Sequence, residues 1–504
     1  MPISRSVLLL ALVAGFAGCR APFESTTFTP PPPPPNAPLL PLRVGSTGSD
    51  FARVVATDGA GNAYVAGYFA GTVDFDAGPG ATAKIANGPY DIAVAKYAPD
   101  GTFQWVFAVG GGDVDSPYAV KVAPDGAVYL AGYASAGALC NGSVIPNYGD
   151  RDILLVRISA AGTCDWAVSV GNTGDDEARD LAIDAAGDVL VAGSFTGTVD
   201  FDPGPATANL ISRGGTDGFV ARYGPDGSFI AVTQFGGTGD DAGTALSLQS
   251  NGDVVVGGTF SGIATFGSPL APLLLTSEGG LDFFVAQLSN DLSLEWAARG
   301  GGAGNDLVSS GGVIAGSDGM DYVTGTFSGT ATLGPGAGGQ AIISKGDVDV
   351  FLTSYTAAGA WSGFQRTFGG TGTESVSAFA QDGAGNFYLG GSFQGSVDFD
   401  PGGSAHVVNA LATSGATDAY LLSLNATGDF RWVNPLSAPV TGDGMLAVTG
   451  GVALAGDGSL WAVGRFYGAV DFDPGQDAVV RQSLGDSDWF VVRYLQTTGG
   501  ITGQ

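Results

Sequence analysis

The sequence predicts an all-β chain that folds as a seven-bladed β-propeller of four-stranded antiparallel blades. Three observations support this fold class: a repeat of about 66 residues, four short strands within each repeat, and a fourth strand that is missing at one end of the chain and present at the other. Of the 504 residues, 44% are apolar and 85 are glycine, so the chain can form a core while making many tight turns.

The repeat is marked by a short strand that ends in glycine. Its seven copies are YVAG at 64–67, YLAG at 129–132, LVAG at 190–193, VVGG at 255–258, YVTG at 322–325, YLGG at 388–391 and WAVG at 461–464. Seven units at this spacing account for the chain from residue 39 onward.

The third unit shows the strands of one repeat most clearly. Apolar runs occupy 178–184 (ARDLAID), 189–195 (VLVAGSF), 217–223 (DGFVARY) and 229–237 (FIAVTQFGG), and turn residues such as DAAGD and GPDGS separate them. These runs are rich in Val, Phe and Tyr, and none continues with helical periodicity. Each unit is therefore predicted to form four antiparallel strands.

The two ends of the chain predict that the ring is closed. The last unit stops after its third strand, WFVVRY at 489–494, while the body begins with LLPLRVGSTGSD at 39–50, which aligns with the fourth strand of the other units. A linear solenoid would gain nothing from this offset, whereas a propeller uses it to join its last blade to its first. The N-terminal strand is expected to complete blade seven.

Residues 1–37 predict export and anchoring. The run VLLLALVAGFA has 11 apolar residues, which is too short to span a bilayer and is typical of a secretory signal. The following FAGC at 16–19 resembles a bacterial lipobox, which implies cleavage after residue 18 and acylation of Cys19. Arg20 after this cysteine implies the outer membrane or cell surface. An ordinary signal peptide that contains a cysteine is the alternative.

The segment 19–37 is expected to be a tether. It contains six consecutive prolines at 30–35, which favour an extended polyproline II spacer. The predicted organisation is therefore a signal peptide at 1–18, a lipid-anchored tether at 19–37 and a propeller at 38–504.

The composition excludes some partners. Asp and Glu outnumber Lys and Arg by 48 to 19, which gives a net charge of −29. Nucleic acids and anionic lipid surfaces need clustered basic residues, so neither is expected as a partner. We expect the chain to contact the membrane through its lipid anchor alone. We also expect the propeller to be monomeric and to bind a protein or glycan of the envelope.

The repeat resembles a known family. Units with YVAG, GTVDFDPG and a following DGFVARY are similar to the SBBP-type repeat of bacterial seven-bladed propellers. The resemblance covers 39–494 and implies the fold and an exported location. It implies no reaction.

One acidic motif recurs between the second and third strands. It reads GTVDFDAG at 71–78, GTVDFDPG at 197–204, GSVDFDPG at 395–402 and GAVDFDPG at 468–475. Its carboxylates are Asp74, Asp76, Asp200, Asp202, Asp398, Asp400, Asp471 and Asp473. Two carboxylates spaced in this way on an extended segment point to the same side and are able to bind calcium. A purely loop-structuring role is the alternative.

A second acidic set precedes the first strand of each blade. Its members are Asp50, Asp115, Asp176, Asp241, Asp306, Glu374 and Asp443. If the first strand is innermost, these residues are expected to form an acidic ring at the mouth of the central channel.

Two further positions are predicted to be structural. An aspartate begins the third strand of every unit and is expected to accept hydrogen bonds from backbone N–H groups. These residues are Asp91, Asp152, Asp217, Asp282, Asp349, Asp418 and Asp488. A tryptophan recurs early in the fourth strand, at positions 105, 166, 296 and 432, and is expected to wedge between blades; a platform for sugars is the alternative.

Cysteine and histidine usage narrows the chemistry further. Cys140 and Cys164 are the two cysteines of the body, and an exported chain favours a disulfide between them, worth on the order of 3 kcal/mol. Two buried thiols are the alternative. The single histidine, His406, excludes a multi-histidine metal site and argues against a Ser-His-Asp triad.

Together these features predict a non-catalytic, exported lipoprotein whose propeller is a binding scaffold. No cofactor other than calcium is expected, and no catalytic residue is assigned. An extracellular hydrolase or lyase with carboxylates at the channel mouth is one alternative, for which the irregular second unit and its Arg151 are the place to look. A purely structural envelope protein is the other.

Overall fold

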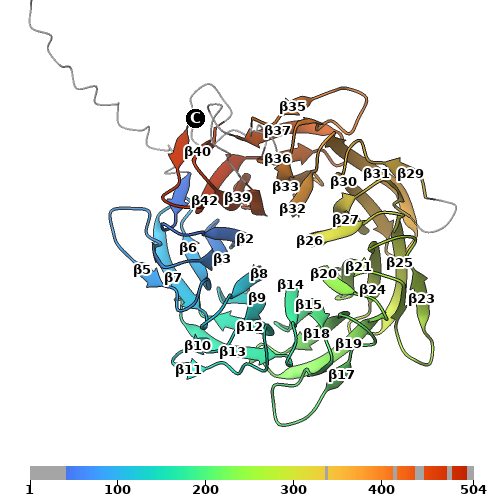
Figure 1. Ribbon diagram of the computed structural model, residues 1–504, viewed down its shortest axis with the longest axis horizontal. Helices are drawn as coiled ribbons and strands as arrows, with labels where there is room; N and C mark the ends of the chain where they lie inside the picture. Colours follow the sequence, from blue (N-terminus) through green and yellow to red (C-terminus); the bar gives the residue numbers. More distant parts are fainter. Residues whose placement is uncertain (1–40, 335–338, 412–416, 438–447, 474–478, 497–504) are drawn as a thin grey trace, which may run out of the picture. The chain divides into compact units, whose positions relative to one another are not determined.

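The computed structural model describes residues 41–334, 339–411, 417–437, 448–473 and 479–496. Within these ranges all regular structure is β-strand, and the strands form seven blades around a central axis (Figure 1). The predicted fold class is therefore confirmed. Among the described residues, no helix has the length and apolarity that a membrane crossing needs.

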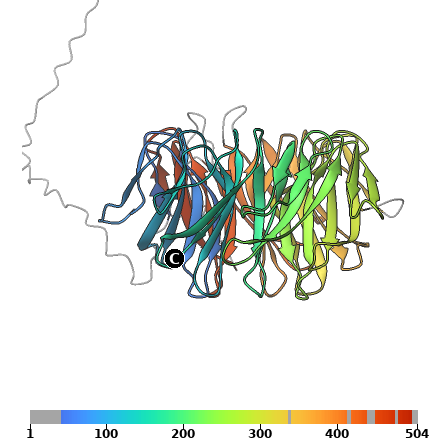
Figure 2. The same ribbon diagram turned by 90° about the horizontal axis from the view of Figure 1, so that it is seen from below.

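Each blade places its first strand innermost and its fourth strand outermost. In blade 1 the order is β2 (Phe51–Thr57), β3 (Ala63–Phe69), β6 (Asp91–Tyr97) and β7 (Phe103–Val109). The innermost strands of successive blades contact one another, and β2 also contacts β38 of blade 7, which closes the ring. The strands run between the two faces of the propeller (Figure 2).

Blades 2 to 6 repeat this order. Blade 2 contains β8 (Ser116–Val122), β9 (Val128–Ala134), β12 (Asp152–Ile158) and β13 (Cys164–Val170). Blade 3 contains β14 (Glu177–Ile183), β15 (Val189–Phe195), β18 (Asp217–Tyr223) and β19 (Phe229–Gly237). Blade 4 contains β20 (Ala242–Leu248), β21 (Val254–Phe260), β24 (Asp282–Leu288) and β25 (Leu294–Gly302). Blade 5 contains β26 (Leu307–Ala315), β27 (Met320–Phe327), β30 (Asp349–Thr356) and β31 (Trp361–Gly370). Blade 6 contains β32 (Ser375–Gln381), β33 (Phe387–Phe393), β36 (Asp418–Leu424) and β37 (Phe430–Leu436).

Blade 7 is completed by the N-terminal strand. It contains β38 (Val448–Leu454), β39 (Ser459–Phe466), β42 (Asp488–Leu495) and, outermost, β1 (Leu42–Val44). The register pairs Leu42 with Val491 and Val44 with Trp489. The predicted closure is therefore confirmed.

The long connection between the second and third strands forms a small hairpin in each blade. The seven hairpins are β4 (Thr72–Asp74) with β5 (Ala83–Ile85), β10 (Leu139–Cys140) with β11 (Ser143–Val144), β16 (Thr198–Asp200) with β17 (Asn209–Ile211), β22 (Ile263–Phe266) with β23 (Leu273–Thr276), β28 (Thr330–Thr332) with β29 (Ala341–Ile343), β34 (Ser396–Asp398) with β35 (Val407–Asn409), and β40 (Ala469–Asp471) with β41 (Val480–Gln482). Three of them, at β22, β28 and β34, also pair with the outermost strand of the preceding blade. These hairpins therefore help to join neighbouring blades.

The hydrophobic core lies between blades. One cluster packs Val44, Trp461 and Trp489 of blade 7 against Val65 and Phe69 of blade 1. Burial of such side chains stabilises the ring by about 25 cal/mol per Å² of apolar surface removed from water.

The recurring tryptophans reach the next blade, as predicted. The Nε1 atoms of Trp105 and Trp166 donate to the carbonyl oxygens of Ala160 and Pro225, each in the next blade's turn before its fourth strand. A Cβ at Gly162 would lie 2.6 Å from the Trp105 ring, so the ring fits only against glycine.

Candidate functional site: the central channel

Every innermost strand carries a β-bulge at the same place. One residue, or a longer stretch in blade 5, is left out of the pairing with the second strand. The bulged positions are Arg53, Tyr118, Arg179, Thr244, Ser309–Gly312, Ser377 and Gly450. Bulges re-aim side chains and are common beside functional sites. Here they divide the ring into a side of large cationic and aromatic residues and a side of small or hydroxyl-bearing residues.

The large side is held by stacked side chains. The guanidinium of Arg53 lies 4.3 Å from the centre of the Tyr118 ring, and that of Arg179 lies 4.8 Å from the same ring. Arg53 also donates from Nη1 to the hydroxyl of Ser116 at 3.0 Å. Arg179 pairs with Glu177, whereas Arg53 has no ion pair among the described residues. Tyr118 thus separates two guanidinium groups and fixes the plane of Arg53.

The same stacking continues on both sides. Arg465 of blade 7 lies 4.9 Å from the centre of the Phe51 ring, next to Arg53. On the other side, Arg151 lies 4.8 Å from the Tyr133 ring and donates to Glu177 at 2.9 Å. We call these four arginines (Arg465, Arg53, Arg179 and Arg151) and their rings the arginine belt. It crosses blades 7, 1, 2 and 3.

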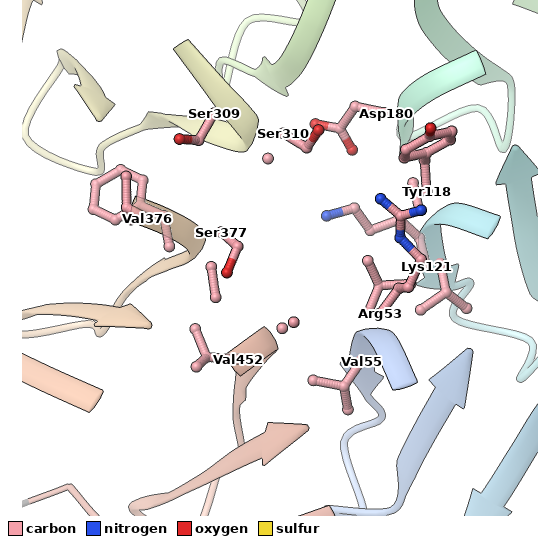
Figure 3. Close-up of a pocket in the computed structure, with 18 of the residues that line it drawn as sticks. Arg53, Val55, Tyr118, Lys121, Asp180, Ser309, Ser310, Val376, Ser377 and Val452 are labelled. Carbon is pink, nitrogen blue, oxygen red and sulfur yellow. The ribbon is translucent and has the colours of Figure 1, made fainter. Parts of the chain in front are cut away.

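The belt borders a cavity of about 350 Å³ inside the channel. Arg53, Tyr118 and Lys121 lie on one side of this cavity, and Ser309, Ser310 and Ser377 lie on the other (Figure 3). Lys121 is exposed and has neither a hydrogen bond nor an ion pair among the described residues. An ammonium group without a hydrogen bond or ion pair among the described residues therefore lies at the cavity of a chain whose net charge is −29.

Asp180 is the carboxylate of the cavity wall. It is 5% exposed, and its two oxygens accept the backbone N–H groups of Leu181 and Leu246 at 2.8 and 2.9 Å. Burial raises its pKa above the usual range, and the charge of Lys121 opposes that shift. Burial thus disfavours the charged form of Asp180, whereas Lys121 and the two backbone N–H groups favour it.

The opposite wall offers hydroxyl groups. The longer bulge of blade 5 places Ser309 and Ser310 beside the cavity, and Gly311 allows the turn with a φ of 64°. The hydroxyls of Ser309 and Ser310 have no hydrogen-bond partner in the described part of the chain, whereas the hydroxyl of Ser377 donates to the carbonyl of Thr449. This wall can exchange hydrogen bonds with a polar ligand.

The predicted acidic ring is not an open ring of charge. The six described members, Asp50, Asp115, Asp176, Asp241, Asp306 and Glu374, are at most 1% exposed. Asp176 illustrates the reason: its two oxygens accept the backbone N–H groups of Asn172 and Thr196, each at 2.8 Å. The interpretation of these residues as a channel-mouth surface is therefore wrong, because the backbone N–H groups of the blade joints enclose them. Asp443 lies outside the described residues.

Each joint contains a second carboxylate, from the aspartate that begins the third strand. The backbone N–H of Asp176 donates to the carbonyl of Arg151 at 2.8 Å, so Asp176 lies beside Asp152; the same bond recurs at Asp50, Asp115, Asp241, Asp306 and Glu374. Burial, together with the charge of Asp152, raises the pKa of Asp176 to about 7. A Cβ at Gly171 would lie 2.0 Å from Asp152, which explains the glycine there. We call these paired carboxyl groups the joint pairs.

The recurring DFD motif shapes the outer hairpins. Asp74 accepts the N–H groups of Asp76 and Thr82 at 3.1 and 2.8 Å, and Asp76 accepts that of Gly78 at 2.9 Å. Phe75 between them is fully buried. Asp200, Asp398 and Asp471 make the same contacts in their blades, Asp202 and Asp400 accept from Gly204 and Gly402, and Asp473 is buried. No group of three or more potential ligands with metal-binding geometry occurs among the described residues.

The cysteines and Arg151 complete the set of predicted residues. Cys140 and Cys164 form a disulfide with a Cα–Cα distance of 5.7 Å, which is the pairing that the sequence suggested. Cys19 lies outside the described residues. Arg151, singled out in the second unit, belongs to the arginine belt.

The arginine belt and Lys121 were missed in the sequence. A signal was present: across the seven first strands, Lys121 and Asp180 stand where the other blades have apolar residues, glycine or serine. This comparison becomes visible only when the bulges align the strands.

Comparisons with known proteins agree with the fold class. No family model matches the chain. The chain is 26% identical over 442 residues to the regulatory protein FlaEY of Caulobacter vibrioides, which covers 82% of this chain and 43% of that protein. It is 22% identical over 314 residues to an uncharacterized WD repeat-containing protein of Acanthamoeba polyphaga mimivirus, covering 50% of this chain and 22% of that protein. The chain spans less than half the length of these curated relatives.

Two solved structures align with this chain at low similarity. A europium-containing methanol dehydrogenase aligns over 84% of both chains with 9% identity and a TM-score of 0.37. A protein of unknown function from Bacteroides caccae aligns over 82% of this chain and 98% of its own, with 11% identity and a TM-score of 0.31. The fold defines the class of this protein, a seven-bladed β-propeller. More particularly, it is a propeller repeat protein with a distant WD-repeat relative.

Proposed function

We propose that this chain is a non-catalytic binding scaffold of the SBBP type, exported and lipid-anchored at the bacterial cell envelope through Cys19. The observation that carries the binding role is the asymmetry of the bulge ring. A purely structural ring has no need to place Arg53, Tyr118 and Arg179 on one side and small residues on the other. Residues that break a repeat in a cavity favour a ligand site.

The enzyme alternative has weaker support. Its carboxylates at the channel mouth are buried in the blade joints, where backbone N–H groups occupy them. Asp180 faces the cavity, but both of its oxygens also accept backbone N–H groups. The relative from Caulobacter is named a regulatory protein, which fits a role in binding.

A cavity-filling variant tests the binding role. Residues 38–504 are prepared with Ser310→Trp, which fills the cavity, and with Ser143→Trp on the exposed hairpin β10–β11 as the matched control. We expect the parent protein and the control to co-sediment with envelope fractions, and Ser310→Trp to remain in solution while keeping its melting temperature. Equal sedimentation of all three proteins, or of none, contradicts the proposal.

A separate experiment tests the anchor. The full chain is expressed in a bacterial host with a radiolabelled fatty acid, beside Cys19→Ser. Incorporation of label and recovery in the outer-membrane fraction are expected for the parent chain, and both should be lost in the variant. If the parent chain incorporates no labelled fatty acid, the proposed lipid anchor at Cys19 is wrong.

A further inference from the structure

The cavity holds more positive charge than its surroundings compensate. Arg53 and Lys121 both line it, and neither has an ion pair among the described residues. Asp180 is the one carboxylate among the residues that line the cavity, so it can offset only one of these two positive charges. Cations that outnumber the carboxylates of a cavity attract an anionic group.

The arginine belt holds Arg53 ready for such a group. Stacking on Tyr118 and the hydrogen bond to Ser116 fix the guanidinium of Arg53. The guanidinium of Arg179 also stacks on the Tyr118 ring. Less side-chain freedom is lost on binding when the group is already held in place. A planar guanidinium pairs best with a carboxylate or phosphate.

The other wall specifies the rest of the ligand. Ser309 and Ser310 face the same cavity with hydroxyls that have no partner in the described part of the chain (Figure 3). Hydroxyls of this kind match a ligand that also bears hydroxyl groups. The cavity volume of about 350 Å³ falls in the range of roughly 300–1,000 Å³ for small-molecule sites.

We propose that the channel binds a carboxylated sugar, a uronic-acid unit, with its carboxylate on Arg53 and Lys121 and its hydroxyls on Ser309 and Ser310. This inference rests on the proposed binding role of the channel and names its ligand class. The sugar is favoured over a phosphate or an acidic peptide because the anion-binding wall and the hydroxyl wall face each other across one small cavity.

Calorimetric titration of residues 38–504 tests the ligand class. The probes are an oligogalacturonate, a neutral galacto-oligosaccharide, inorganic phosphate and an oligoglutamate. We expect the oligogalacturonate alone to bind at micromolar to millimolar concentration. Arg53→Gln and Lys121→Gln should each weaken binding at least about tenfold, and Ser310→Ala several-fold. Lys84→Gln, on hairpin β4–β5, is the matched control and should bind as the parent does.

Each other outcome overturns the inference. Equal binding of phosphate means an anion site without selection for sugar, and binding of oligoglutamate means a peptide site. If the neutral sugar binds, or if Lys121→Gln binds the oligogalacturonate as tightly as the parent does, the positive charge of the cavity does not select the ligand. If no probe binds but Ser310→Trp still abolishes sedimentation with the envelope, the ligand class is wrong and the binding role stands.

Discussion

The blade joints and the channel wall are built by the same repeat, but the repeat is kept in one and broken in the other. At six of the joints, all those whose carboxylate is among the described residues, a carboxylate in the same place accepts backbone N–H groups. In the channel, the bulged residue changes from Arg to Tyr, Ser or Gly between blades. Residues that stay constant from blade to blade support the fold, and residues that vary between blades are the candidates for ligand contacts.

The largest effect is expected where the repeat is constant. Asp176→Ala should lower the free energy of unfolding by about 3 kcal/mol, because it removes a buried carboxyl group and leaves the part-buried N–H groups of Asn172 and Thr196 without an acceptor. Equilibrium denaturation in urea measures the change. Asp175→Ala, the exposed neighbour, is the control and should change stability by less than about 0.5 kcal/mol. Equal effects would show that the joint does not depend on its carboxylate.

A pH dependence of stability should come from the same joints. Burial raises the pKa of Asp115, Asp241 and Asp306 to about 6 and that of Asp176 and Glu374 to about 7. Unfolded carboxyl groups titrate near pH 4, so the folded state binds more protons between these values. These groups therefore make their full contribution to the free energy of unfolding below about pH 4, and this contribution is lost as the pH rises through about 6 to 7.

The measurement is a series of thermal melts across that range. The melting temperature should be higher at pH 5 than at pH 8. Glu374→Gln, which cannot ionise, should reduce this difference, whereas a substitution of the exposed Asp175, the last of the causes that raise the pKa of Asp176, should change it less. A melting temperature that rises with pH would contradict the assignment of raised pKa values to the joint pairs.

The sequence predicted the fold because the repeat period and the displaced fourth strand are both visible along the chain. It located the joint carboxylates but not their surroundings, since spacing does not show that the N–H groups of residues 172 and 196 converge on Asp176. The arginine belt was missed for a similar reason. Arg465 and Phe51 are far apart in the sequence and meet only when the ring closes between blades 7 and 1.

A smaller effect on stability is expected in the channel. Lys121→Gln should change the free energy of unfolding by less than about 0.5 kcal/mol, because the exposed ammonium makes no hydrogen bond or ion pair among the described residues. The adjacent Val120 is 3% exposed, and Val120→Ala should cost about 2 kcal/mol by opening a cavity. Urea denaturation of both variants compares them directly. A large loss in Lys121→Gln would mean that Lys121 supports the fold, and its role in ligand binding would need another explanation.

The smallest effect is expected from calcium. The DFD carboxylates were predicted either to bind calcium or to structure loops, and the hydrogen bonds of Asp74 to the N–H groups of Asp76 and Thr82 favour the second alternative. Calcium would have to compete with these N–H donors for the same oxygen atoms. Titration of residues 38–504 with calcium should therefore give no heat and no shift in melting temperature, and a chelator should have no effect. A rise in melting temperature that Asp74→Asn reduces would instead make the outer hairpins cation sites, and the constant parts of the repeat would then serve binding as well as architecture.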